Sequence, residues 1–203
     1  MTLADKITFV RLVLAPIFFV IYLLPRFFPS GYGEGLFISL VWTVPVLWVL
    51  FLVSEISDLL DGIVARKRGE VSDFGKLFDP FADTLAKIAY FLCFVIDGIF
   101  PALAFLIVLY REYSVLFVRN LMLKKGIAMG ARMSGKVKTV CYFIAGALAL
   151  LASSFTRLGF DGDFYRWLVM AANVVFVCSV VVAVFSLIEY VLVYKKTPVS
   201  ENK

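Results

Sequence analysis

Four aspartates between positions 58 and 83 have the spacing that best suits chemistry in this chain. Asp58 and Asp61 are three residues apart, and Asp79 and Asp83 are four apart, so each pair lies on one face of a helix. A short basic segment separates the pairs, and we therefore expect two antiparallel helices whose carboxylates converge. Ligation by carboxylates alone suits Mg²⁺ or Mn²⁺, and two such ions can hold a pyrophosphate during displacement at phosphorus.

Small residues accompany both pairs of aspartates. Gly62 and Ala65 share the stripe of the first pair, and Gly75 shares that of the second. They leave room for a ligand or for a neighbouring backbone, and Arg66 is suited to holding phosphate oxygens. Small residues at this spacing are also typical of plain helix packing, and the first pair of aspartates alone would fit a solvated helix end. The four acids and the glycines together favour a binding site.

The composition predicts a membrane protein. Of the 203 residues, 62% are hydrophobic and 17% are charged, and the mean hydropathy is +0.95. Soluble domains are roughly 45–50% apolar and about 25% charged, and a core of this size cannot bury the excess. These values exclude a disordered chain and argue strongly against a soluble globular domain.

The charged residues narrow the classes of function further. The chain has 20 Lys and Arg, 15 Asp and Glu, and no His, which excludes His-ligated zinc and His-based catalytic triads. We interpret the net charge of +5 as basic cytoplasmic loops, and we expect no nucleic-acid partner. The three cysteines lie in apolar stretches without metal-ligand spacing, so we expect free thiols.

The apolar segments predict an all-α integral membrane protein with six transmembrane helices. A helix needs about 20 residues to cross a bilayer. The six segments run over about 7–25, 36–66, 74–96, 99–120, 137–156 and 167–194. We expect one catalytic domain over 1–196, whose first helix is retained, and a short polar tail over 197–203. Fifteen basic residues lie on the side of the termini and three on the other, so we expect both termini in the cytoplasm.

The pattern of acids and small residues resembles the signature of a known family. The chain reads Asp58-x2-Asp61-Gly62-x2-Ala65-Arg66-x8-Gly75-x3-Asp79-x3-Asp83, which is similar at all eight positions to the signature of the CDP-alcohol phosphatidyltransferases. The resemblance implies the CDP-alcohol phosphotransferase fold and a homodimer. It also implies transfer of a phosphatidyl group from CDP-diacylglycerol to an alcohol, with release of CMP.

The resemblance also implies roles for individual residues. The ligands of two divalent cations (Mg²⁺ or Mn²⁺) would be Asp58, Asp61, Asp79 and Asp83, and Asp83 would also deprotonate the attacking hydroxyl. The positions that contact CDP would be Gly62, Ala65, Arg66 and Gly75. Thr8 and Arg11 are expected to line the site. Many relatives have Pro-Asn where this chain has Ala4-Asp5, so the role of Asp5 stays open.

Three further stretches resemble the bacterial phosphatidylglycerophosphate synthases within this family. They are KITFVRLVLAP at the start, Arg111-Glu112 in the fourth segment, and KKGIAMGARMSGKVKTV before the fifth. This favours glycerol-3-phosphate as the acceptor, with its phosphate held by Arg111, Arg119, Lys136 and Lys138. A cation in an apolar helix is costly unless it faces a partner or an aqueous cavity. In the alternative interpretation, Arg119 pairs with Glu112, and the lysines only mark the cytoplasmic side.

Other interpretations of the acceptor and of the class of protein remain open. Inositol phosphate, serine or phosphatidylglycerol serves as the acceptor in other members of the family. An intramembrane prenyltransferase is more remote, because its helix count and acid spacing differ from those of this chain. A divalent-cation transporter is also more remote, because no repeat typical of many transporters is evident and the acids crowd one end. We expect a bacterial inner membrane with the active site on the cytoplasmic side, and membrane lipids as further partners.

Overall fold

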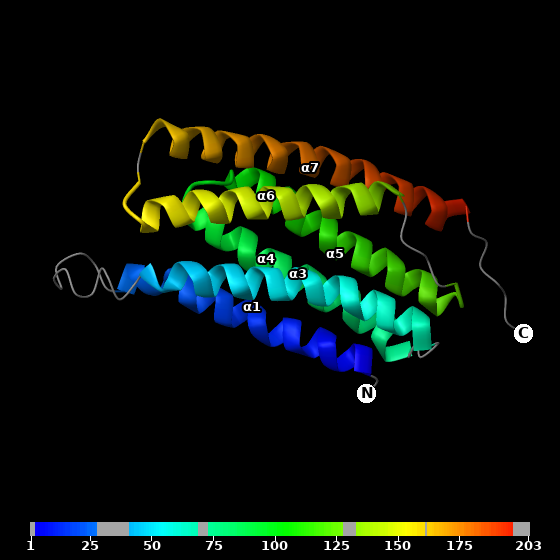
Figure 1. Ribbon diagram of the computed structural model, residues 1–203. Helices are drawn as coiled ribbons and strands as arrows, with labels where there is room; N and C mark the ends of the chain where they lie inside the picture. Colours follow the sequence, from blue (N-terminus) through cyan, green and yellow to red (C-terminus); the bar gives the residue numbers. More distant parts are fainter. Residues whose placement is uncertain (1–2, 28–40, 69–72, 128–132, 161, 197–203) are drawn as a thin grey trace, which may run out of the picture.

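The computed structural model is a bundle of long helices (Figure 1). It describes residues 3–27, 41–68, 73–127, 133–160 and 162–196, except the side chains of 3–4, 59–68, 73–74 and 76. The described residues form six helices and no strand. The helices are α1 (Leu3–Phe27), α3 (Thr43–Arg68), α4 (Asp73–Ile96), α5 (Ala102–Lys124), α6 (Met133–Arg157) and α7 (Asp163–Lys196).

The all-helical prediction is confirmed for the described residues, and each predicted segment overlaps one of these helices. Among the described residues, three helices are long and apolar enough to cross a membrane: α1 over Asp5–Phe27, α6 and α7. The chain is therefore an integral membrane protein. Helices α3, α4 and α5 carry charged side chains within their length, and the start of the span expected at 36–66 lies outside the described residues, as does the tail at 197–203.

The helices are aligned roughly along one axis, and the start of α1 lies at the same end of the bundle as the end of α7 (Figure 1). Helix α1 packs against α3 and α4, while α7 packs against α5 and α6. The chain reverses between α4 and α5 at Gly98, whose φ of 73° is in the left-handed region that favours glycine. The backbone N–H of Ile99 donates there to the carbonyl of Phe94 at 2.9 Å, which caps the end of α4.

Aromatic rings fill the centre of the bundle. Phe91 of α4 makes edge contacts with Tyr142 of α6 and Phe176 of α7, and Phe176 stacks on Phe100 with ring centroids 4.0 Å apart. Helix α6 approaches α3 closely at Gly146, where an added Cβ would lie 3.3 Å from the ring of Phe51. This core joins α3, α4, α6 and α7, and so it fixes the distances between the helices that carry the polar residues.

Arg157 ties three helices together at the end of the bundle away from the termini. From the last turn of α6, its Nη2 donates to the carbonyl of Tyr22 in α1 at 2.7 Å, and its Nη1 donates to Thr43 Oγ1 in α3 at 3.2 Å. Its guanidinium also lies 4.6 Å from the centroid of the Tyr22 ring. A single cation thus serves backbone, hydroxyl and ring acceptors that come together only in the folded bundle.

We expect Arg157→Met to lower the midpoint of thermal unfolding in detergent by about 6 °C or more, because its hydrogen bonds to Tyr22 and Thr43 are lost. Hydrogen bonds to a charged group contribute about 1.5–3 kcal/mol each, and about 1 kcal/mol shifts the midpoint by about 2–4 °C in a chain of this size. Arg166→Met is the matched control, because Arg166 is 81% exposed and its pairing with Asp163 spans 3.7 Å. Equal midpoints for the two variants would contradict a tethering role for Arg157.

Candidate active site

Carboxylates from two helices converge on one arginine. Asp58 lies on α3 and Asp83 on α4. The Nη1 of Arg11, from α1, lies 2.7 Å from Asp58 Oδ1 and 4.0 Å from Asp83 Oδ1. The two acids predicted to converge therefore do lie around one cation, which α1 supplies by packing against both α3 and α4. Asp61 belongs to the same helix as Asp58. The side chains of residues 59–68 are outside the structure's description, and these include Asp61, Ala65 and Arg66 and the surroundings of Gly62.

Helix α1 supplies polar partners to both pairs of aspartates. Arg11 is 1% exposed, and its Nε also donates to Ser57 Oγ at 3.3 Å. Thr8, three residues earlier and on the same face of the helix, donates its hydroxyl to Asp79 Oδ1 at 2.6 Å. Asp5, three residues before Thr8, is also buried. Thr8 and Arg11 thus lie against the aspartates, as expected of residues that line the site.

A buried lysine provides a second cation beside Asp83. Lys87 lies four residues further along α4, and its Nζ is 2.5 Å from Asp83 Oδ1. No role was predicted for Lys87, although a spacing of four between an acid and a lysine is itself a signal for such a pair. The two carboxylates are therefore compensated from two sides, which offsets the cost of placing them in an apolar bundle.

The donor chemistry of this cluster fits a hard divalent cation. Its acidic ligands are carboxylates on α3 and α4, and oxygen ligands are those that Mg²⁺ and Mn²⁺ prefer. Among the residues that the structure describes, no three acidic side chains lie close enough to form a metal site by themselves. The side chain of Asp61 is outside that description, and the metal site stays a prediction.

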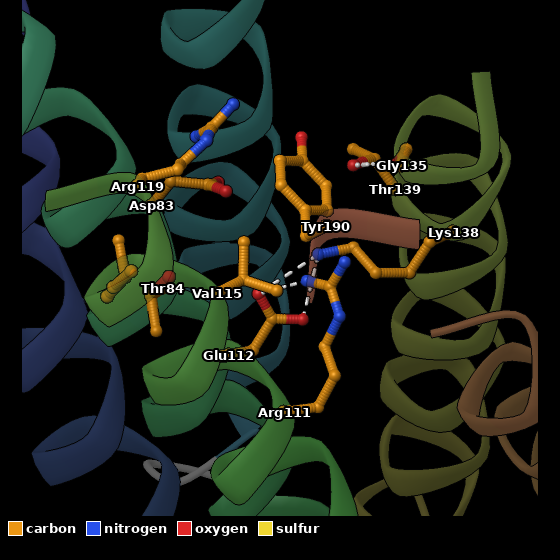
Figure 2. Close-up of a pocket in the computed structure, with 11 residues that line it drawn as sticks. Asp83, Thr84, Arg111, Glu112, Val115, Arg119, Gly135, Lys138, Thr139 and Tyr190 are labelled. Carbon is orange, nitrogen blue, oxygen red and sulfur yellow. Dashed lines mark hydrogen bonds and ion pairs between the residues drawn. The ribbon is translucent and has the colours of Figure 1, made fainter. Parts of the chain in front are cut away.

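A second polar region adjoins the first through Asp83. It is a cavity of about 190 Å³ between α4, α5, α6 and α7 (Figure 2). The polar and charged residues in its lining are Asp83, Thr84, Arg111, Glu112, Arg119, Lys138, Thr139 and Tyr190. Three of the four cations predicted to bind a phosphate thus line one cavity with the aspartate predicted to act as the base. Lys136 is exposed on α6 and is not among the lining residues.

The carboxylate of Glu112 is hydrogen-bonded to two of the cations that line the cavity. Its carboxylate accepts hydrogen bonds from Lys138 Nζ at 2.8 and 3.0 Å and from Arg111 Nη1 at 2.9 Å. Arg111 is held from behind by α7, because its Nε donates to the carbonyl of Ala183 and its Nη2 to Ser186 Oγ. The expectation that Arg111 faces a partner inside the bundle is met by these contacts.

Arg119 stands apart from this cluster. It lies over the ring of Tyr190, 5.7 Å from the centroid, and its buried Nε has no hydrogen-bond partner among the described residues. No hydrogen bond joins it to Glu112 in the described part of the chain, so the seven-residue spacing does not lead to the alternative pairing. A desolvated donor of this kind is suited to an anionic ligand, since leaving it unpaired costs about 1–3 kcal/mol.

Some residues of the site had no signal in the sequence. Thr84 and Tyr190 line the cavity from helix positions that read only as apolar packing, and only the arrangement of the helices brings them there. Gly75, predicted to contact CDP, is buried on α4.

Comparison with known proteins identifies the group to which the chain is related. The profile of the CDP-alcohol phosphatidyltransferases matches residues 1–192. The chain belongs to the CDP-alcohol phosphatidyltransferase family. This family is generally dependent on divalent cations, in agreement with the donor chemistry of the aspartates.

Relatives of this phosphatidyltransferase come from several bacteria. A CDP-diacylglycerol–glycerol-3-phosphate 3-phosphatidyltransferase from Treponema pallidum is 37% identical over 94% of this chain and 88% of its own length. A protein of the same name from Bacillus subtilis is 34% identical over 85% of this chain and 90% of its own. A probable phosphatidylglycerophosphate synthase from Mycobacterium tuberculosis is 28% identical over 93% of this chain and 79% of its own.

We expect Arg11→Met to lower the thermal unfolding midpoint in EDTA, and Mn²⁺ to restore part of the loss. The substitution leaves Asp58 without its hydrogen-bonded cation, and a bound divalent ion would supply the missing positive charge. Arg26→Met is the control, since Arg26 pairs with Asp97 at 2.9 Å in an exposed position far along α1. A loss of stability that Mn²⁺ leaves unchanged would contradict a metal site at these carboxylates.

Proposed function

We propose that this enzyme transfers the phosphatidyl group of CDP-diacylglycerol to glycerol-3-phosphate, giving phosphatidylglycerophosphate and CMP. The observation that carries the proposal is the shared cavity of Asp83 and three cations. An acceptor that carries both a reacting hydroxyl and a phosphate needs a carboxylate and cationic groups within one small space. The names of the relatives from Treponema pallidum and Bacillus subtilis support the same acceptor.

In the proposed reaction, Asp83 takes the proton of the acceptor hydroxyl. The hydroxyl oxygen attacks the phosphorus that carries the lipid, a new P–O bond forms, and the P–O bond to CMP breaks. The cations of the cavity, above all Arg119, hold the acceptor's phosphate so that its hydroxyl faces Asp83. Lys87, bonded to Asp83, keeps the carboxylate oriented.

The four aspartates are proposed to hold two divalent cations. When bound, these ions would neutralise the pyrophosphate oxygens and stabilise the phosphate of the departing CMP. The CDP moiety is assigned by the family signature to Gly62, Ala65, Arg66 and Gly75. Thr8 and Arg11 support the carboxylates from α1, with the hydroxyl of Thr8 on Asp79 and the guanidinium of Arg11 on Asp58.

We further propose that all six helices span the membrane, with both termini and the active site on the cytoplasmic side of a bacterial inner membrane. Helix α1 begins at the end of the bundle where α5 ends with Lys124 and α7 ends with Lys196 (Figure 1), and lysines at helix ends are typical of the cytoplasmic side. Asp58 and Asp79 lie in the halves of α3 and α4 nearest to it. CDP-diacylglycerol would then enter from the inner leaflet and the acceptor from the cytoplasm, and the enzyme would act as a homodimer.

The first test is release of CMP from CDP-diacylglycerol by the detergent-purified protein with Mg²⁺ or Mn²⁺. Glycerol-3-phosphate, inositol phosphate, serine and phosphatidylglycerol are supplied one at a time, and we expect release only with glycerol-3-phosphate. Asp58→Asn and Asp61→Asn should abolish release while the protein stays folded. Release with another acceptor alone would overturn the substrate assignment, and full activity of either variant would overturn the metal assignment.

Two lysines on α6 provide a matched test of the cavity. Lys138 is buried in the cavity wall, whereas Lys136, two residues earlier, is exposed. We expect Lys138→Met to raise the KM for glycerol-3-phosphate about tenfold or more, because a charge-assisted contact contributes about 1.5–3 kcal/mol, and to leave the KM for CDP-diacylglycerol unchanged. The effect of Lys136→Met on the acceptor KM should be smaller, and the reverse order would place the acceptor outside this cavity.

A further inference from the structure

The carboxylate of Glu112 occupies the place in the cavity where an anionic ligand would find its cations. Glu112 is 7% exposed. It accepts hydrogen bonds from Arg111, from Lys138 and, at 3.3 Å, from the hydroxyl of Tyr142. In Figure 2 the charged ends of Arg111 and Lys138 both turn toward this carboxylate. A carboxylate that receives several charge-assisted hydrogen bonds resembles a bound phosphate in its contacts.

The hydrogen bonds within this cluster leave only some of the N–H groups of Arg111 and Lys138 available to a ligand. With described residues, Arg111 uses three of its five N–H groups, one each on Ala183, Glu112 and Ser186. Lys138 donates two hydrogen bonds, both to Glu112, and its Nζ also lies 5.0 Å from the centroid of the Tyr142 ring. Arg111 and Lys138 carry two positive charges and Glu112 one negative charge, so the cluster has a net charge of +1 rather than +2. A phosphate entering the cavity must share these two cations with Glu112.

Arg119, in contrast to Arg111 and Lys138, does not bind Glu112 in the described part of the chain. In Figure 2 its guanidinium points away from the Glu112 cluster, and its Nε lacks a partner among the described residues. The cavity thus contains one cation with spare donors and two whose charge is partly compensated in advance. An enzyme that must release a phosphorylated product as well as bind a phosphorylated acceptor benefits from such compensation, because excess affinity for the ground state does not speed the reaction.

We propose that Glu112 is an internal counter-anion that competes with the acceptor's phosphate for Arg111 and Lys138, and so sets the affinity of the cavity for phosphorylated ligands. Glu112 acts through the two cations and is a positioning residue. The proposal deepens the function proposed above and rests on it for the identity of the acceptor. The competition itself concerns the binding of a phosphate group and can be measured without turnover.

The test compares Glu112→Gln with the wild type in the detergent-purified full chain, in EDTA and at constant ionic strength. Inorganic phosphate and glycerol-3-phosphate are the probes, and the readout is the concentration that gives half of the maximal rise in the unfolding midpoint. Gln keeps the shape and one acceptor oxygen but removes the charge. We expect both probes to bind about tenfold more tightly to Glu112→Gln, equivalent to about 1.4 kcal/mol.

Glu189→Gln is the matched control. Glu189 accepts a hydrogen bond from Ser134 between α6 and α7 and is not among the residues that line the cavity, so the same substitution there should leave phosphate binding unchanged. Glu112→Asp keeps the charge but shortens the side chain, and its affinity should lie between those of the wild type and Glu112→Gln. It also serves as the test if Glu112→Gln fails to fold.

Unchanged or weaker phosphate binding in Glu112→Gln would overturn the proposal, as would equal tightening in Glu189→Gln. If Glu112→Gln does not fold, Glu112→Asp must bind phosphate more tightly than the wild type, and the proposal fails otherwise. In turnover with glycerol-3-phosphate, we expect a lower KM for the acceptor and an unchanged KM for CDP-diacylglycerol. Failure of the proposed function would appear instead as absence of CMP release by the wild type, whatever the binding results.

Discussion

Charge compensation inside an apolar bundle is the constraint on which this structure depends. Ionised side chains between transmembrane helices are costly unless each faces a partner. Asp58, Asp83 and Glu112 meet this condition with cations, and in each case a cation comes from another helix: Arg11 of α1 for Asp58 and, at 4.0 Å, for Asp83, and Lys138 of α6 for Glu112. The ion pairs therefore specify which helices must be neighbours, in addition to the packing of their apolar faces.

The two polar clusters are connected through α4. Asp83 faces Arg11 and Lys87 on one side and lines the cavity with Thr84 on the other. A phosphatidyl donor held at the aspartates and an acceptor held in the cavity would therefore meet at one carboxylate. This arrangement gives a physical reason for the apolar packing of α4 against its neighbours, since a small shift of this helix would change both halves of the site together.

The two ends of the bundle differ in the contacts that join their helices. Near the termini, acids and cations are concentrated around the proposed site, and such sites are held at a cost in stability. At the other end, Arg157 joins α1, α3 and α6 through neutral acceptors, and aromatic rings fill the space between. The contacts of Arg157 hold α1, α3 and α6 together, while at the charged end carboxylates from α3 and α4 lie around Arg11.

The sequence by itself determined the class of protein, the helices and the four aspartates. Hydropathy depends on composition and length, and the spacing of acids on a helix depends on its period alone, so both can be read without tertiary structure. The partners that the charges find on other helices could not be read in this way. Only the packing of α5 and α6 against α7 decided that Glu112 on α5 binds Lys138 on α6, that Arg119 lies beside Tyr190, and that Lys136 is exposed. Contacts between residues distant in sequence depend on how the helices are rotated and placed relative to one another. The periodicity of one helix carries no information about the rotation or position of the helix beside it.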